Sequence, residues 1–153
     1  MDTRELRNCF GRFATGVTVV TYTADGERYG LTVNSFTSVS LEPPLLLVSI
    51  DRRAKAYENL KGRPFVVNIL SAEQIDIAWH FAGRTKEGLE IAWREGKQAP
   101  RLDGVLGWLE CTPWQTYDGG DHMLFLGEIK DFDYRDGEPL IFYAGKMTSL
   151  MPK

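Results

Sequence analysis

The segment Gly30-Leu-Thr-Val-Asn-Ser-Phe-Thr-Ser-Val-Ser-Leu-Glu-Pro-Pro44 is rich in small polar side chains. Side chains of an extended chain alternate between two faces, so Thr32 and Asn34 share one face. Hydroxyls, an amide and closely approaching backbone suit the polar edge of a flat heterocycle, which needs a few fixed hydrogen bonds. The alternative is that these are ordinary outward-facing residues of half-buried strands, and the pattern alone favours that alternative.

A second candidate segment is basic. Ser49-Ile-Asp-Arg-Arg-Ala-Lys55 places three cations within four residues, after an apolar run of strand length and at the start of a helix-compatible segment. The end of a strand, the start of a helix and basic side chains together are typical of a phosphate-binding arrangement. A solvated charged loop has the same composition and is the simpler explanation for this segment taken alone.

Histidine and tyrosine provide the remaining candidates. His122 follows the glycine turn 119–121, from which it could meet a ligand at the rim of a barrel, although a turn histidine is more often only exposed. His80 lies between two aromatic residues in an apolar segment, which favours a structural role. Tyr143 could stack on a ring, and it would be equally ordinary as a core residue.

Several catalytic motifs are absent from the sequence. It contains no GxGxxG, GxxxxGK[ST], GxSxG or HExxH pattern. The two cysteines, Cys9 and Cys111, allow one disulfide, which we do not expect, and no zinc site of the usual kind, so no metal site is predicted. A chain this poor in side chains for bond-breaking is expected, if it is an enzyme, to rely on a cofactor.

Hydrophobic periodicity predicts a mostly β protein that positions these residues. We expect seven or eight short strands and two or three short helices. The strands are expected within residues 16–22, 28–33, 36–40, 45–50, 65–70, 105–116, 123–130, 132–135 and 140–143, and the helices within residues 6–16, 53–60 and 71–80. Residues 83–104 are predicted to form a long surface excursion.

Turn signals between the strands favour antiparallel pairing. Asp25-Gly26, residues 118–121 and Asp136-Gly137 are typical of hairpin turns. Closing such a sheet into a barrel removes its exposed edges. Because no linker, repeat or low-complexity tract is visible, residues 1–153 are expected to form a single domain.

Composition limits the possible partners and compartment. The 153 residues carry a formal net charge of −3, which gives no support for nucleic-acid binding. The longest apolar stretch, Leu45 to Val48, is too short to span a membrane, and residues 1–10 lack the apolar run of a signal peptide. A cytoplasmic protein without a membrane or nucleic-acid partner is therefore expected.

The order of the segments resembles one family. Its motifs are Phe13-Ala-Thr-Gly-Val-Thr-Val-Val20, the Gly30–Pro44 segment, Phe65-Val-Val-Asn-Ile-Leu70, His80-Phe-Ala-Gly83, Gly120-Asp-His122 and Pro139-Leu-Ile-Phe-Tyr143. Together they are similar to the short-chain flavin reductases, the reductase components of two-component flavin monooxygenases such as 4-hydroxyphenylacetate 3-monooxygenase. The resemblance runs from about Leu6 to Tyr143.

The resemblance implies an antiparallel split β-barrel with a Greek-key-like arrangement that forms a homodimer. It implies hydride transfer from NADH or NADPH to a diffusible FMN or FAD, and a separate oxygenase that uses the reduced flavin. It implies flavin contacts from residues 32–35 and 49–52, and a phosphate near Lys55 with Arg52 or Arg53. It also implies a cover over the site and a nicotinamide near two further side chains. These residues are Thr32, Val33, Asn34, Ser35, Ser49, Ile50, Asp51, Arg52 and Lys55, then Phe81, Ala82 and Gly83 as the cover, and finally His122, as a catalytic candidate, and Tyr143.

Two questions stay open from the sequence. Family members often carry serine where this chain has Ala54, so one phosphate contact is absent, and Lys55 or Arg53 is expected to compensate. The residues do not choose between FMN and FAD or between NADH and NADPH. An alternative is an electron-transfer flavoprotein on the same fold that holds FMN tightly.

Overall fold

The computed structural model describes residues 1–151 and is dominated by antiparallel strands. The strands are β1 (Thr15–Gly16), β2 (Thr18–Ala24), β3 (Glu27–Val33), β4 (Thr37–Leu41), β5 (Pro44–Asp51), β6 (Phe65–Ile69), β7 (Trp93–Glu95), β8 (Pro100–Leu102), β9 (Gly107–Gly119), β10 (His122–Tyr134), β11 (Leu140–Tyr143) and β12 (Lys146–Ser149). The helices are α1 (Thr3–Phe10), α2 (Lys55–Asn59), α3 (Ile75–His80) and a short 3-10 helix, η1 (Ala72–Gln74).

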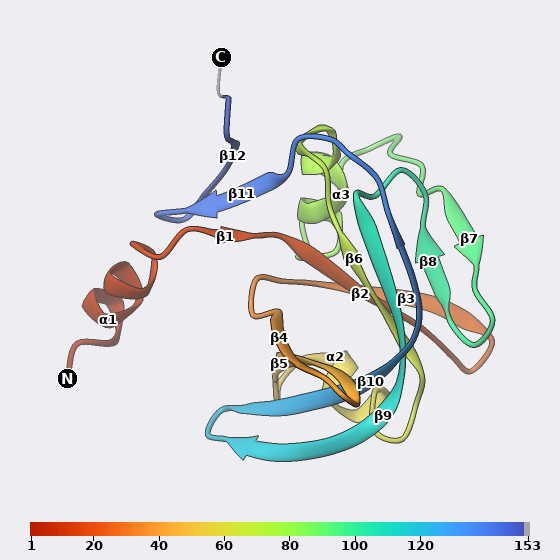
Figure 1. Cartoon of the computed structure of the whole chain (residues 1–153). Coiled ribbons are helices and arrows are strands. Elements are labelled where there is room, and N and C mark those ends of the chain that lie inside the picture. Colours follow the sequence, from red (N-terminus) through yellow and green to blue (C-terminus); the bar gives the residue numbers. More distant parts are fainter. Residues whose placement is uncertain (152–153) are drawn as a thin grey trace.

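Seven strands form a curved main sheet in the order β3-β2-β6-β9-β10-β5-β4 (Figure 1). β3 and β4 stand at the two ends of this order, so the barrel is split between them. A three-stranded sheet, β1-β11-β12, and the hairpin β7-β8 complete the described strands. The predicted mostly β, antiparallel split barrel with short flanking helices is confirmed.

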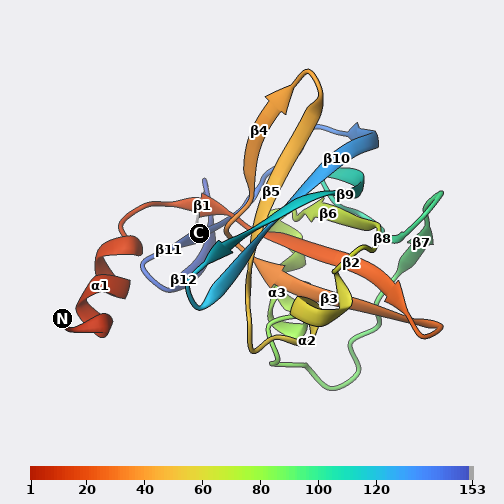
Figure 2. The same cartoon turned by 90° about the horizontal axis from the view of Figure 1, so that it is seen from below.

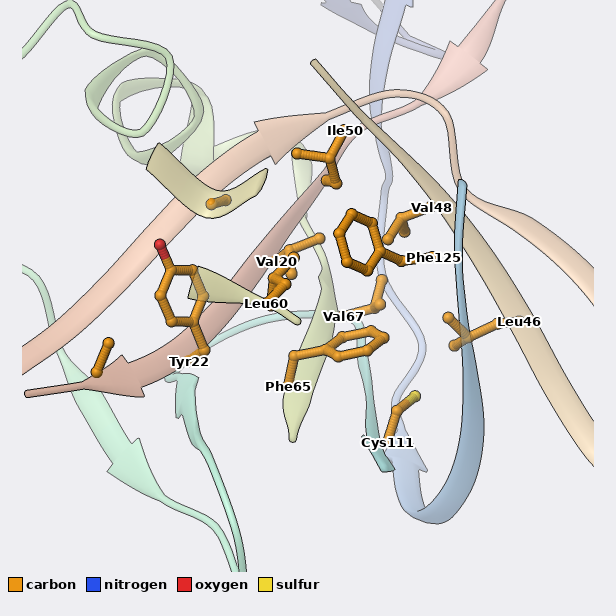
Figure 3. Close-up of a cluster of buried hydrophobic side chains, with 12 residues drawn as sticks. Val20, Tyr22, Leu46, Val48, Ile50, Leu60, Phe65, Val67, Cys111 and Phe125 are labelled. Atoms are coloured by element: carbon orange, nitrogen blue, oxygen red, sulfur yellow. The ribbon is translucent and has the colours of Figure 1, made fainter. Parts of the chain in front are cut away.

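The barrel interior is filled by large apolar side chains from opposite walls. Val20 and Tyr22 of β2 meet Val48 and Ile50 of β5 and Phe65 of β6 (Figure 3). Val17 and Val19 belong instead to a second core with Leu70, Ala78, Leu102, Val105 and Leu140. β2 therefore has apolar residues on both faces, because both faces are covered by other parts of the chain.

The turns follow the predicted chemistry. Asp25 and Gly26 have φ angles of 52° and 78°, as a tight hairpin turn requires, and they join β2 to β3. Pro113 lies at a register shift between β9 and β10, which is the predicted irregularity of a strand that contains proline. Ser71 and Gln74 form the predicted capping box before α3.

Residues 83–104 are more ordered than the sequence predicted. Residues 93–102 of this segment form the β7-β8 hairpin, in which Ala99 and Leu102 are buried. The backbone of this hairpin is held by Glu110 of β9, whose carboxylate accepts hydrogen bonds from Gln98 N and Ala99 N at 3.0 and 3.1 Å. Asn68 of β6 accepts a third from Leu102 N. These partners lie far away in sequence, so local periodicity did not reveal the hairpin.

Three further boundaries differ from the prediction. The first helix ends at Phe10 rather than near Gly16, because Thr15 and Gly16 pair with β11 as strand β1. Tyr143 is not at the end of the last strand, since a turn at Ala144 and Gly145 leads into β12. The two segments predicted within 123–135 are one long strand, β10.

The N-terminal helix stands away from the barrel (Figures 1 and 2). It contains no buried residue, and its apolar side is exposed, with Phe10 at 69% and the following Phe13 at 77%. Such an apolar stripe is normally covered by another surface. None of the helices within residues 1–151 is long and apolar enough to cross a membrane.

Candidate functional site

Two adjoining hollows lie where β3 ends. The first, which we name the Thr32 hollow, has a volume of about 240 Å³ and is lined by Val17, Thr32, Val33, Asn34, Trp79, Ala82, Phe142, Gly145 and Met147. The second, the Thr15 hollow, has a volume of about 430 Å³ and is lined by residues 13–18, 34–37 and Ile69. Val17 and Asn34 line both. Asn34 therefore marks the boundary between the two.

Thr32 holds the end of α3 against β3. Its hydroxyl donates to the Ala78 carbonyl at 2.6 Å, and its N–H donates to the Phe81 carbonyl at 3.1 Å. These two bonds satisfy carbonyls at the C-terminus of the helix and cover the free edge of β3. The hydroxyl oxygen keeps its acceptor capacity toward the hollow.

Gly30 makes this packing possible. A Cβ at position 30 would lie 2.6 Å from the Phe81 ring, so only glycine allows the ring to lie on β3. The ring also contacts His80 and Trp93 edge-on. Gly83, with φ of 91°, then turns the chain away from the helix. The segment predicted to cover the site, Phe81 to Gly83, is thus fixed beside Thr32.

Ser35 connects the end of β3 to β5. Its Oγ accepts a hydrogen bond from Ser49 N at 2.9 Å and donates to the Ser49 carbonyl at 3.1 Å. The Asn34 side chain is exposed, and within residues 1–151 it makes no hydrogen bond. Asn34 is consequently the polar side chain at this point that keeps its full hydrogen-bonding capacity for a ligand.

The basic segment after β5 is mostly engaged with the protein itself. Arg52 donates to the Gly120 carbonyl, to Tyr57 Oη and to Asp118 Oδ1, the last at 2.6 Å. Arg53 pairs with Asp51 at 2.9 Å, and its guanidinium and N–H lower the pKa of that carboxyl to about 2. Neither arginine is a free anion donor in this arrangement.

Lys55 is the cation of this segment without a carboxylate partner in the part of the chain that the structure describes. Its Nζ lies 5.3 Å from the centre of the Tyr29 ring, on the neighbouring β3. The side chain of Ile50, in contrast, is fully buried in the barrel core. Only the backbone of Ile50 is therefore available to a ligand.

His122 and Asp51 form a directly opposed pair across β10 and β5. Nδ1 of His122 also lies 2.7 Å from Oδ1 of Asp121, in an exposed contact. The imidazole therefore has one carboxylate next to it in the preceding turn and another on the facing strand. Tyr143 belongs to the three-stranded sheet, where it pairs with Lys146 and is 41% exposed.

Thr15 is a candidate site residue that the sequence did not single out. Its Oγ1 is the one buried side-chain polar atom within residues 1–151 that lacks a hydrogen-bond partner, and the residue lines the Thr15 hollow. Such an atom normally has a partner, so a ligand group is its natural complement. The sequence signal was present in Phe13–Val20, but the partner strand β11 that places Thr15 could not be inferred.

The lining of the two hollows fits a flavin ring. Among the described residues, the lining contains aromatic, aliphatic, hydroxyl and amide side chains and no charged one. An uncharged flat ring with hydrogen-bonding groups along one edge matches this donor set. The residues quoted for the resemblance lie around the same boundary, with Thr32, Val33, Asn34 and Ala82 in one lining.

Comparison with known proteins decides the family. Residues 10–151 match the sequence model of the flavin reductase like domain. This chain belongs to the flavin reductase like family. An NADH-dependent flavin reductase of Rhodococcus sp is 43% identical over 95% of this chain and 85% of that protein. The reductase component of a flavin-dependent trigonelline monooxygenase of Acinetobacter baylyi is 42% identical over 93% of this chain but 47% of that protein.

Solved flavin reductases also share the architecture. The flavin reductase PheA2 in its native state superposes with a TM-score of 0.94 at 39% identity, covering 99% of both chains. At this similarity the whole split barrel, with its added N-terminal helix and β11-β12 hairpin, is common to the two flavin reductases.

Proposed function

We propose that this protein is a flavin reductase that uses NADH to reduce diffusible FMN or FAD. The observation that carries the proposal is the match over nearly the full length to an NADH-dependent flavin reductase, together with uncharged hollows at the motif residues. When bound, the flavin accepts a hydride from the reduced nicotinamide. The chain has to position two rings rather than supply an acid or a base.

The flavin ring is proposed to lie at the boundary of the Thr32 and Thr15 hollows. Asn34 provides an amide donor and acceptor, and Thr15 provides a buried hydroxyl without a partner. The Thr32 hydroxyl donates to the Ala78 carbonyl, so its oxygen is left to accept a hydrogen bond from the flavin, and Phe81 to Gly83 limit access of water. Ser35 and Ser49 act together by fixing the backbone next to Asn34.

The phosphate is proposed to approach Lys55. Arg52 and Arg53 bind carboxylates and carbonyls of the protein, whereas Lys55 lies against an aromatic face. His122 is proposed for the nicotinamide side, because the turn that carries it ends next to Asp51, at the end of β5. Tyr143 is proposed to assist from the three-stranded sheet.

A homodimer is part of the proposal. The exposed apolar side of α1 and the outer half of β9, in which Trp114 is 45% and Tyr117 51% exposed, need a partner surface. Both regions extend away from the barrel, which is the shape expected of surfaces that wrap around a second copy of this chain. A cytoplasmic location is also proposed, since Cys9 and Cys111 are both free thiols.

A separate oxygenase is the proposed consumer of the reduced flavin. The relative from Acinetobacter baylyi is named as such a reductase component. Release to a partner requires moderate affinity for the flavin. The alternative, an electron-transfer protein with tightly held FMN, predicts instead that the purified protein stays yellow through dialysis.

The experiment that tests the function follows NADH oxidation at 340 nm with and without added FMN or FAD. Turnover that rises and saturates with added flavin is expected, and the two saturation curves rank the flavins. If the purified protein carries bound flavin but does not oxidise NADH, the electron-transfer alternative would be favoured. Absence of both bound flavin and turnover would contradict the proposal.

The proposed site is tested by Asn34→Ala. Because this exposed side chain makes no hydrogen bond within residues 1–151, the variant is expected to unfold at the same denaturant concentration but bind FMN about tenfold more weakly. Gln98→Ala, an exposed amide in the β7-β8 turn, is the matched control. Equal flavin affinity in the Asn34 variant and the control would remove Asn34 from the site.

A further inference from the structure

A third hollow lies away from the two described above. It has a volume of about 320 Å³ and shares no lining residue with them. Its walls come from β7, the β8-β9 connection (residues 101–108) and the end of β10 that is farthest from His122. We name it the Arg101 hollow. Its volume is at the lower end of the range that small organic ligands occupy.

Arg101 contributes a fixed and unpaired guanidinium to this hollow. Its Cζ lies 4.1 Å from the centre of the Trp108 ring, so one flat face of the cation rests on the indole. Among residues 1–151, no carboxylate or carbonyl lies within hydrogen-bonding distance of it. The stacking restricts the side chain while leaving its N–H edges available, which is the arrangement in which arginine recognises a carboxylate.

The other two arginines of the lining are occupied. Arg135 donates to the carbonyls of Gly104, Val105 and Asp136, which fixes the loop that forms one wall. Arg94 donates from Nε to Asp103 at 2.7 Å, which leaves its terminal N–H groups free. Arg101 is therefore the arginine of this lining whose side chain makes no hydrogen bond at all within residues 1–151.

The charge of the lining favours a monoanion. Three arginines (94, 101 and 135) and two aspartates (103 and 133) give a balance of one positive charge. A phosphate dianion would meet the two carboxylates as well as Arg101, whereas a single carboxylate matches the excess. This balance separates the Arg101 hollow from an ordinary phosphate site.

Apolar side chains complete the hollow. Leu106 and the Trp108 indole provide carbon surface beside the guanidinium, whereas Leu102 and Val105 are buried and expose little of theirs. Tyr134 stands at the rim, 76% exposed. Carbon walls next to one unpaired cation suit a small ligand with a ring at one end and a charge at the other.

We propose that the Arg101 hollow binds a small aromatic monocarboxylate, whose carboxylate accepts two hydrogen bonds from the Arg101 guanidinium and whose ring packs against Leu106. This site is independent of the flavin site. It is a second ligand site on the protein, for an aromatic acid rather than for flavin.

The probe for this proposal is sodium benzoate, and the readout is the ¹⁵N indole signals of the full-length protein. The chain has four tryptophans, and Trp108→Phe identifies the signal of Trp108. A saturable shift of that signal with benzoate is expected at constant ionic strength. In Arg101→Met the apparent dissociation constant is expected to rise at least tenfold. Benzamide, the neutral analogue, is expected to cause no saturable shift.

Arg28→Met is the matched control, because Arg28 also lies over an indole, that of Trp93, but is paired with Glu95 and does not line the hollow. It is expected to leave the benzoate titration unchanged. Three results would overturn the proposal. These are no saturable shift of the Trp108 signal, an equal shift with benzamide or inorganic phosphate, or a shift of the signal of Trp79, in the Thr32 hollow, instead of that of Trp108. NADH oxidation with added flavin, measured on the same samples, reports separately on the flavin reductase function.

Discussion

Arg52 donates a hydrogen bond of 2.6 Å to Asp118, and this contact holds the β9-β10 turn against the end of β5. The same side chain donates to the Gly120 carbonyl at 2.8 Å, and the backbone N–H of Arg52 donates to the Asp121 carbonyl. The ion pair raises the pKa of Arg52 and lowers that of Asp118. His122 follows directly after this turn. Arg52 is therefore a positioning residue for His122, in a segment whose composition suggested phosphate binding.

Replacement of Arg52 by methionine is expected to loosen the turn and raise the KM for NADH about tenfold, because a displaced ring partner lowers the fraction of productive complexes. The KM for flavin is expected to change less. Steady-state rates at 340 nm, with each substrate varied in turn, separate the two effects. Lys130→Met, which removes another surface ion pair of β10, is the control. A larger increase in the KM for flavin than in the KM for NADH would instead support phosphate binding by Arg52.

Gly30→Ala tests the packing of Phe81 on β3. The added methyl group would lie 2.6 Å from the ring, so the ring or the strand has to move, and the loss in unfolding free energy is expected to be about 1–3 kcal/mol. Chemical denaturation measures this loss. Gly16→Ala is the matched control, because a Cβ there meets nothing within 4 Å. Combining Gly30→Ala with Phe81→Leu is expected to restore part of the stability, and simple additivity of the two losses would contradict the contact.

The two cysteines are expected to differ sharply in reactivity. Cys9 is exposed on α1, whereas Cys111 is buried in the barrel, and burial raises the pKa of its thiol from 9.0 to about 12. At pH 8 a thiol reagent should label one equivalent per chain quickly and the second only as the protein unfolds. In Cys9→Ser the fast equivalent should disappear. Two fast equivalents in the native protein would show that the barrel opens at β9.

Burial of Cys111 also has a consequence for stability at high pH. The unfolded chain ionises this thiol near pH 9.0, but the folded chain does so only near pH 12. The free energy of unfolding that comes from keeping this thiol neutral is therefore fully present below about pH 9. It is lost as the pH rises toward 12. Comparison with Cys111→Ala across this range isolates the contribution, since alanine cannot ionise.

The sequence predicted those parts of the fold that depend on local chemistry. Asp25-Gly26 and the pairing of Ser71 with Gln74 act within a few residues, so their patterns were sufficient. The β7-β8 hairpin was missed because its anchors, Glu110 and Asn68, come from strands distant in sequence. Long-range partners of this kind leave no periodicity in the segment that they hold.

The candidate site was likewise predicted in part. The resemblance selected Thr32 and Asn34, which the structure places in one lining. Composition alone could not show that the donors of Arg52 are consumed by the β9-β10 turn, or that Ile50 points into the core. Thr15 was missed because its importance arises from burial without a partner, which only the folded chain displays.

Ala54→Ser tests the phosphate side of the proposed site. Ala54 is the N-cap of α2 with extended backbone, φ −74° and ψ 146°, and no side chain caps the helix there. Serine at this position is expected to stabilise the protein by about 1 kcal/mol, because its hydroxyl accepts a hydrogen bond from the first turn. Denaturant unfolding of the flavin-free protein measures that gain.

The same variant is also expected to bind FMN severalfold more tightly than the original chain, since its hydroxyl adds a donor beside Lys55. Riboflavin, which lacks the phosphate, is the discriminating ligand, and its affinity is expected to stay unchanged. Ala54→Cys is the nearly isosteric control, because a thiol is a weak hydrogen-bonding group. Gains of equal size for FMN and riboflavin would place the phosphate elsewhere, and the added stability would then be the only effect of the serine cap.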